Sequence, residues 1–174
     1  MKTFIFSIFL SCAFFQGAEA CTGKRSGQVG DCAPDFKVTT QSGQVIELSS
    51  LKGKVVFLNF WATWCRPCIA EIPDLEKLNQ KLKGQPFEMV ALSIDTDGQK
   101  AIDAFFKKFF NGKPPAFPNA IDTGKKISHQ YGTFKVPETF IIDKNGKITD
   151  KFEGIRGWSE PIYANYLKLL TKAK

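Results

Sequence analysis

Two cysteines separated by two residues stand in the stretch Asn59–Cys68, which reads NFWATWCRPC. A pair at this spacing can bind a metal, close a small structural loop or exchange electrons with another protein. A structural zinc site needs four ligands, and the sequence holds one histidine, His129, and no second pair of this kind. A disulfide across two residues closes so small a loop that it adds little stability. Cys65 and Cys68 therefore indicate thiol–disulfide exchange, with no metal and no cofactor.

The residues around this pair predict a strand followed by a helix. Residues 55–60 form a continuous apolar run, which is typical of a strand buried on both faces. Apolar residues then recur at helical spacing, namely Ile69, Ile72, Leu75, Leu78 and Leu82. Cys65 would begin this helix, where free backbone N–H groups favour a thiolate, and Arg66 adds positive charge. We expect Cys65 to be the exposed nucleophile and Cys68, one turn further, to resolve the mixed disulfide.

The rest of the chain predicts a single α/β domain. Further strands are expected at 36–38, 45–48, 87–94, 117–121, 139–143 and 147–152, and further helices at 99–110, 125–131 and 159–171. Asn145-Gly146 is a hairpin signal between the last two strands. This order of elements predicts a mixed central sheet with helices on both faces.

The first twenty residues have the layout of a secretory signal peptide. One lysine precedes an apolar run of about 12 residues, and Ala18-Glu19-Ala20 forms a cleavage pattern. A spanning helix needs roughly 20 apolar residues, so we expect cleavage after Ala20, with an uncleaved anchor as the alternative. The folded domain would then comprise residues 21–174 and lie in the periplasm or another extracytoplasmic compartment.

Export changes how the remaining cysteines are interpreted, because the compartment is oxidising. Four cysteines allow three pairings, and a second disulfide between Cys21 and Cys32 is the most economical of them. Alternatively, Cys21 would be the first residue after cleavage and could carry a lipid that attaches the protein to a membrane. Ala18-Glu19-Ala20 is a poor match to a lipid-attachment sequence.

The net charge of the chain is +7, from 24 basic and 17 acidic residues. Removal of residues 1–20 takes one lysine and one glutamate, so the exported form keeps 23 − 16 = +7. The lysines are scattered over predicted helix faces, which favours a solvated basic surface over a docking face for acidic proteins or anionic lipid. Nothing in the sequence resembles a nucleic-acid-binding module.

The motif and its surroundings resemble the exported thioredoxin-like proteins of the TlpA/ResA/DsbE (CcmG) type. The resemblance rests on NFWATWCRPC, on Ala33-Pro34-Asp35-Phe36 and on Gly53-Lys54-Val55-Val56, and it covers roughly residues 30–170. It implies a thioredoxin fold with an N-terminal β extension and an inserted βα unit. It also implies a protein-disulfide reductase that acts on exported proteins, such as apocytochrome c during cytochrome c maturation. A membrane electron donor would then re-reduce the cysteine pair.

The same resemblance implies a substrate-binding loop far from the cysteines in sequence. Val136-Pro137-Glu138-Thr139-Phe140 matches the family's cis-proline loop, so Pro137 is expected against the disulfide. The backbone of Val136 would then pair with an extended substrate, and Glu138 and Trp64 would lie within its reach. An ordinary trans proline that opens a strand is the alternative.

A proton acceptor for Cys68 is the remaining part of the expected site. Glu71 falls where ResA-like proteins keep a glutamate, and a half-buried carboxyl there could take the proton of Cys68. Its alternative is a solvated helix residue. Asn59 occupies the position of a buried aspartate in thioredoxin, and a neutral amide cannot accept that proton. The task therefore falls to Glu71 or Glu138.

Other functions remain open at this point. The same scaffold could act as a general disulfide oxidant or as the partner of an isomerase, because the potentials of such pairs span about −270 to −120 mV. A peroxiredoxin-like thiol peroxidase would share the Ala-Pro-Asp-Phe segment, but residues 62–64 lack the proline that its peroxidatic site needs. A copper-handling or chaperone module would need a different cysteine spacing and a metal-binding histidine.

Overall fold

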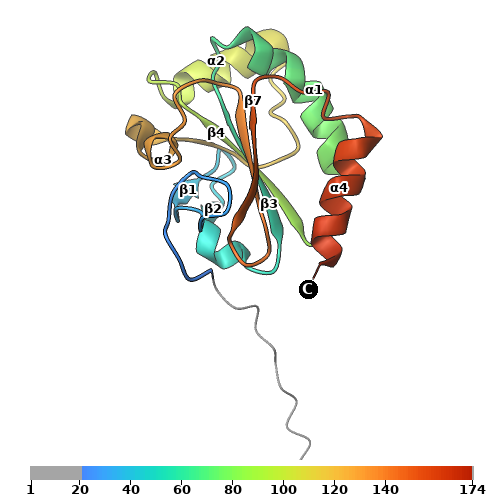
Figure 1. The fold of residues 1–174 in the computed structure, drawn as a ribbon. Helices are drawn as coiled ribbons and strands as arrows, with labels where there is room; N and C mark the ends of the chain where they lie inside the picture. Colours follow the sequence, from blue (N-terminus) through green and yellow to red (C-terminus); the bar gives the residue numbers. More distant parts are fainter. Residues whose placement is uncertain (1–20, 174) are drawn as a thin grey trace, which may run out of the picture.

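A five-stranded sheet forms the centre of the protein, in the order β5-β4-β3-β6-β7 (Figure 1). The computed structural model describes residues 21–173, so the expected signal peptide lies outside the described residues. The strands are β3 (Val55–Trp61), β4 (Phe87–Ser93), β5 (Asn119–Ile121), β6 (Glu138–Ile142) and β7 (Ile148–Glu153). β3, β4 and β5 run parallel, whereas β6 and β7 pair antiparallel, so the predicted mixed sheet is confirmed.

Helices cover both faces of this sheet, as expected. They are α1 (Arg66–Lys81), α2 (Gln99–Phe109), α3 (Lys126–Gln130) and α4 (Pro161–Lys172), with short 3-10 turns η1 (Leu48–Leu51) and η2 (Thr123–Lys125). Figure 1 shows α1 beside α4 on one side of the sheet. On the other side lie α3 and the N-terminal hairpin of β1 (Lys37–Thr39) and β2 (Val45–Glu47). Within residues 21–173, none of the helices combines the length and the apolar character that crossing a bilayer requires.

Strand β3 supplies side chains to the cores on both faces, which is why all seven of its residues are apolar or buried. The ring of Phe57 packs edge-on against Trp158, with centroids 4.9 Å apart, on the side of α1 and α4. Phe60 points to the opposite side, where its ring lies 5.7 Å from that of Tyr131. Because side chains alternate along a strand, Asn59 lies on the same face as Phe57.

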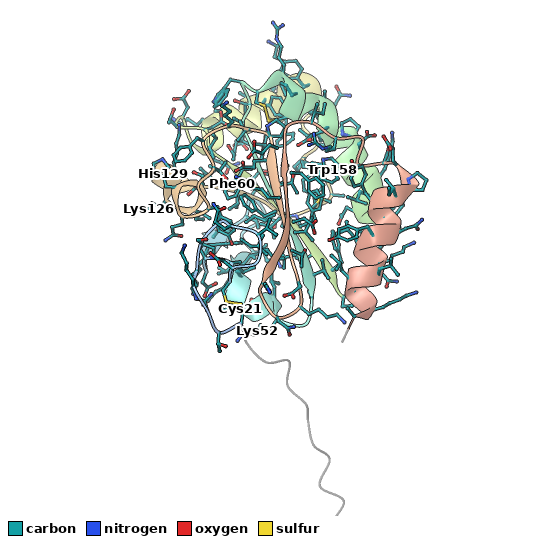
Figure 2. All side chains as sticks on the ribbon, viewed as in Figure 1. Cys21, Lys52, Phe60, Lys126, His129 and Trp158 are labelled. Atoms are coloured by element: carbon teal, nitrogen blue, oxygen red, sulfur yellow. A yellow bond between two sulfur atoms is a disulfide. The ribbon has the colours of Figure 1, made fainter. Side chains whose placement is uncertain are left out.

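Cys21 and Cys32 form a disulfide within the N-terminal segment, and backbone hydrogen bonds join that segment to the β6–β7 hairpin. The Cys21 N–H donates to the carbonyl of Asn145 at 2.9 Å, and the Ala33 N–H donates to that of Gly146 at 2.9 Å. Figure 2 shows Cys21 at the end of the molecule opposite α2. The hairpin follows the last residue of β6, whereas the proline loop precedes Glu138, the first residue of β6. The length of β6 therefore separates the Cys21–Cys32 disulfide from the proline loop.

Candidate redox site

Cys65 and Cys68 are joined as a disulfide at the start of α1, directly after the carboxyl end of β3. Cys65 is the N-cap of the helix, and its Sγ accepts the backbone N–H of Cys68 at 3.2 Å. Pro67 lies in the first turn, where its missing N–H leaves no hydrogen bond unmade. The partial positive charge of the helix terminus therefore bears directly on the Cys65 sulfur.

Cys65 is more covered than the sequence led us to expect. It is 5% exposed and Cys68 is 1% exposed, so both sulfurs lie at the edge of the core. The cover comes from the loop before β6, whose Val136 carbonyl oxygen lies 3.5 Å from Cys65 Sγ. A substrate would therefore approach Cys65 along this loop.

The fold brings that loop against the disulfide although 71 residues separate Val136 from Cys65. The peptide bond between Val136 and Pro137 is cis. The carbonyl of Pro137 accepts the Gly154 N–H at 2.9 Å, which joins the loop to the segment after β7. Two exposed aromatic residues adjoin the site in sequence. Trp64, directly before Cys65, is 64% exposed, and Phe134, two residues before Val136, is 81% exposed.

Glu71 is a buried carboxyl in the core beneath the cysteines, with 1% of its surface exposed. Its Oε1 accepts the side-chain amide of Asn59 at 3.1 Å, and that amide also donates to Thr139 Oγ1 at 3.0 Å. Its Oε2 accepts the indole N–H of Trp158 at 3.1 Å. The carboxyl is thus held by side-chain donors from β3 and from the loop after β7.

Burial raises the pKa of Glu71 from 4.5 to about 7. The hydrogen bonds from Asn59, Trp158 and the Arg156 backbone act in the opposite direction, as does the Arg156 guanidinium. Desolvation outweighs them because it penalises the charged form of a carboxyl that is almost entirely removed from water. Glu71 can therefore gain and lose a proton near neutral pH.

A small cavity lies behind Cys68 and is lined in part by Asn59, which donates to Glu71. Its lining includes Cys68, Asn59, Trp61 and Asn119. Its volume of about 10 Å³ is roughly enough for one water molecule. Cys68 and Glu71 are three residues apart on α1, so they share one face of the helix. Asn59 both lines the cavity and donates to the Glu71 carboxyl.

Glu138, the other expected proton acceptor, lies on the opposite face of the sheet. It pairs with Phe60 across β3 and β6, whereas its neighbour Thr139 pairs with Asn59. The Glu138 carboxyl accepts the hydroxyl of Thr133 and forms an ion pair with Lys151 at 2.9 Å. The structure thus brings Glu71, and not Glu138, onto the face that carries Cys68.

A third buried carboxyl near the cysteines was missed by sequence reasoning. Asp95 lies just after β4 and accepts the backbone N–H of Thr63 at 2.9 Å and its hydroxyl at 2.7 Å. Ser93 donates to the same carboxyl at 2.6 Å. These bonds fix the turn between β3 and Cys65. The parallel order of two strands that end at one edge could have indicated this proximity.

Trp158 was also missed, and no local signal in the sequence could have found it. It lies 87 residues from Glu71, in the loop between β7 and α4. Only the packing of α4 beside α1 brings it to the carboxyl.

Among residues 21–173, no cluster of three or more His, Cys, Asp or Glu side chains could hold a metal ion.

Comparison with known proteins places the chain among thiol–disulfide oxidoreductases. The model of the redoxin family matches residues 28–167. The thiol–disulfide oxidoreductase ResA of Bacillus thuringiensis is 42% identical over 148 residues, which cover 85% of this chain and 82% of that protein.

Solved structures show the same fold. A Chlorobium tepidum protein described as the thiol:disulfide interchange protein DsbE superposes with a TM-score of 0.68 and 32% identity, covering 82% of this chain and 94% of that one. The exposed lipoprotein thioredoxin Etrx1 of Streptococcus pneumoniae gives a TM-score of 0.65 at 28% identity, covering 79% of this chain and all of that one. The predicted thioredoxin fold is therefore confirmed.

Proposed function

The chain belongs to the redoxin family and is a thiol–disulfide oxidoreductase, and we propose that it reduces disulfides of exported proteins outside the cytoplasm. One observation carries the proposal: a cysteine pair that caps a helix lies between a substrate-accessible loop and a buried carboxyl that titrates near pH 7. The loop can receive the substrate, and the carboxyl can move the proton that the second thiol must lose.

The reaction begins from the reduced pair. The Cys65 thiolate attacks one sulfur of a substrate disulfide, so a bond forms between Cys65 and the substrate while the other substrate sulfur leaves as a thiolate. Cys68 then attacks Cys65, which forms the Cys65–Cys68 disulfide and releases the second substrate sulfur. Two electrons pass from the pair to the substrate, and the two substrate thiolates take up protons.

We assign the proton of Cys68 to Glu71. Cys68 must lose its proton to attack, and it is too deeply buried to lose it directly to bulk water. A carboxyl with a pKa of about 7 is about half ionised at neutral pH, which makes it an effective base for a thiol.

Substrate binding is assigned to the surface beside Cys65. The Val136 backbone offers hydrogen bonds to an extended peptide, and Pro137 holds that backbone beside the disulfide. Trp64 offers an exposed apolar surface. Glu138 is buried and acts on binding through the loop that it anchors at Thr133.

The partners in this proposal are exported proteins that carry disulfides, with apocytochrome c during cytochrome c maturation as the first candidate. A membrane electron donor would return the pair to the dithiol. The signal-like residues 1–20 support an extracytoplasmic location, as does the similarity to an exposed lipoprotein. We propose that Cys21 carries no lipid in this chain, because its sulfur is bonded to Cys32.

The reduction potential of the Cys65/Cys68 pair, measured together with its redox state in intact cells, tests the direction of electron flow. We expect a potential near the thioredoxin value of about −270 mV and a reduced pair in cells. A potential near about −120 mV with the pair oxidised in cells would instead make the protein an oxidant. Cys65→Ser should abolish the reduction of a peptide disulfide, and it serves as the blank in this assay.

A further inference from the structure

The loop between β7 and α4, residues 154–160, connects two parts of the redox site. At its start, the Gly154 N–H donates to the carbonyl of Pro137 at 2.9 Å. Four residues later, the indole N–H of Trp158 donates to the Glu71 carboxyl at 3.1 Å. The loop thus contacts both the substrate-binding segment and the expected proton acceptor.

Trp158 is the most deeply buried residue of this loop. Its side chain is 1% exposed and packs against Phe57 at 4.9 Å, Phe152 at 5.3 Å and Tyr163 of α4 at 4.7 Å between ring centroids. Figure 2 shows it on the side of the sheet that α1 and α4 cover. A buried indole N–H needs a partner, and with the ring fixed on three sides that partner is Glu71 Oε2 at 3.1 Å.

The ionised form of Glu71 depends on hydrogen bonds from neutral donors for its stabilisation. Its charged or titratable neighbours are the Arg156 guanidinium from the loop and Cys68 on its own helix. β3 and β6 present neutral side chains, Asn59 and Thr139. The ionised carboxyl is therefore stabilised by neutral donors and by one cation that lies partly in solvent.

We propose that Trp158 is a positioning residue for thiol–disulfide exchange: its indole N–H holds the Glu71 carboxyl in the orientation and the charge state that accept the Cys68 proton. The inference rests on the proposed function, in which Glu71 is that acceptor. Without the indole donor, Oε2 would be buried without its partner, and a carboxyl in this state favours the protonated form. A protonated Glu71 cannot take a second proton.

Trp158→Phe removes the donor and keeps an aromatic ring. Three hydrogen bonds can lower the pKa of a carboxylate by two units or more, so the loss of one should raise the midpoint of Glu71 by about one pH unit. We would follow this midpoint by ¹³C NMR of the Glu71 carboxyl carbon, assigned with Glu71→Gln. The rate of mixed-disulfide resolution at pH 7 should fall about fivefold and recover as the pH rises, because the ionised fraction falls from about one half to about one tenth.

Tyr163→Leu is the matched control, because Tyr163 packs on the Trp158 ring and leaves the indole N–H in place. It should lower the stability and leave the midpoint of Glu71 unchanged. An unchanged midpoint in Trp158→Phe, or an equal shift in both variants, would overturn the role of Trp158.

The wild-type protein provides a test that does not depend on the folding of a variant. The Trp158 indole N–H resonance, identified by its contacts to Phe57 and Tyr163, should titrate with the same midpoint as the Glu71 carboxyl carbon. An indole resonance that is independent of pH would also overturn the proposal. If the wild-type protein reduces no peptide disulfide while this co-titration is present, the proposed function fails and the hydrogen bond between the two residues remains.

Discussion

Glu71 and Glu138 are both almost completely buried, and they lie on opposite faces of the sheet at 1% and 4% exposure. Glu71 accepts hydrogen bonds from two neutral side-chain donors, the amide of Asn59 and the indole of Trp158. Glu138 instead faces an ammonium group, that of Lys151, at 2.9 Å. Two carboxyls of similar burial therefore have different electrostatic surroundings.

The difference assigns different roles to the two carboxyls: Glu71 is placed to exchange a proton, and Glu138 stabilises the loop before β6. Glu71 forms no salt bridge like that of Glu138, so burial outweighs its hydrogen bonds and the charge of Arg156, and the pKa of Glu71 rises to about 7. At Lys151, burial lowers the pKa, but the hydrogen bonds to Glu138 and Glu153 and the charges of these two carboxyls outweigh burial and raise it. Lys151 therefore keeps its charge beside Glu138, and the pair anchors the loop before β6 through Thr133.

The largest expected effect is the pH dependence of stability that Glu71 produces. Its pKa is raised on folding, so its contribution to the free energy of unfolding is fully present below about pH 4.5 and is lost as the pH rises through about 7. At about 1.4 kcal/mol per pKa unit, this loss amounts to about 3 kcal/mol. Denaturant unfolding of the oxidised protein between pH 4.5 and 8 measures it. Glu71→Gln should remove this slope and Glu138→Gln should retain it, whereas a slope that persists in Glu71→Gln would contradict the assignment.

The second effect is kinetic and distinguishes the two carboxyls by their reactivity. Glu71→Gln should slow the resolution of a mixed disulfide by Cys68 about 100-fold at pH 7, because the thiol loses its base. Glu138→Gln should change this rate by less than about threefold, about 0.7 kcal/mol in the barrier. Single-turnover kinetics with a peptide disulfide separates this step from the attack by Cys65, and alkylation of Cys65 serves as the control. Equal resolution rates for Glu71→Gln and Glu138→Gln would contradict the assignment of Glu71 as the base for Cys68.

The third effect concerns the ion pair between Glu138 and Lys151. A double-mutant cycle of Glu138→Gln and Lys151→Met should give a coupling of about 1–2 kcal/mol in the free energy of unfolding, because one partner is buried and the other retains only 23% exposure. The exposed pair of Asp74 and Lys77 on α1 is the matched control, with about 0.3–0.5 kcal/mol expected. If the two couplings agree, Glu138 contributes no more than a surface charge does.

The sequence predicts the elements of this site better than it predicts their contacts. The apolar run of β3 and the helical spacing after Cys65 indicate the strand, the helix and the placing of the cysteine pair at their junction, because these patterns are local. The resemblance supplied the loop at Pro137. The neighbours of Glu71 depend on how α4 packs against α1, and no local pattern encodes the contact with Trp158. The face on which Glu138 lies follows from the register of β6 on β3, which the sequence does not contain.

The smallest effect tests whether the two faces of β6 are independent. Thr139 is next to Glu138 in sequence, but its hydroxyl accepts from Asn59 on the Glu71 side. Thr139→Val leaves one hydrogen of the Asn59 amide without a partner, which should cost about 1 kcal/mol of stability. Because Asn59 keeps its bond to Glu71, the midpoint of that carboxyl should move by less than about half a pH unit. A shift as large as that of Trp158→Phe would mean that Asn59, held by Thr139, is the donor that sets the charge of Glu71.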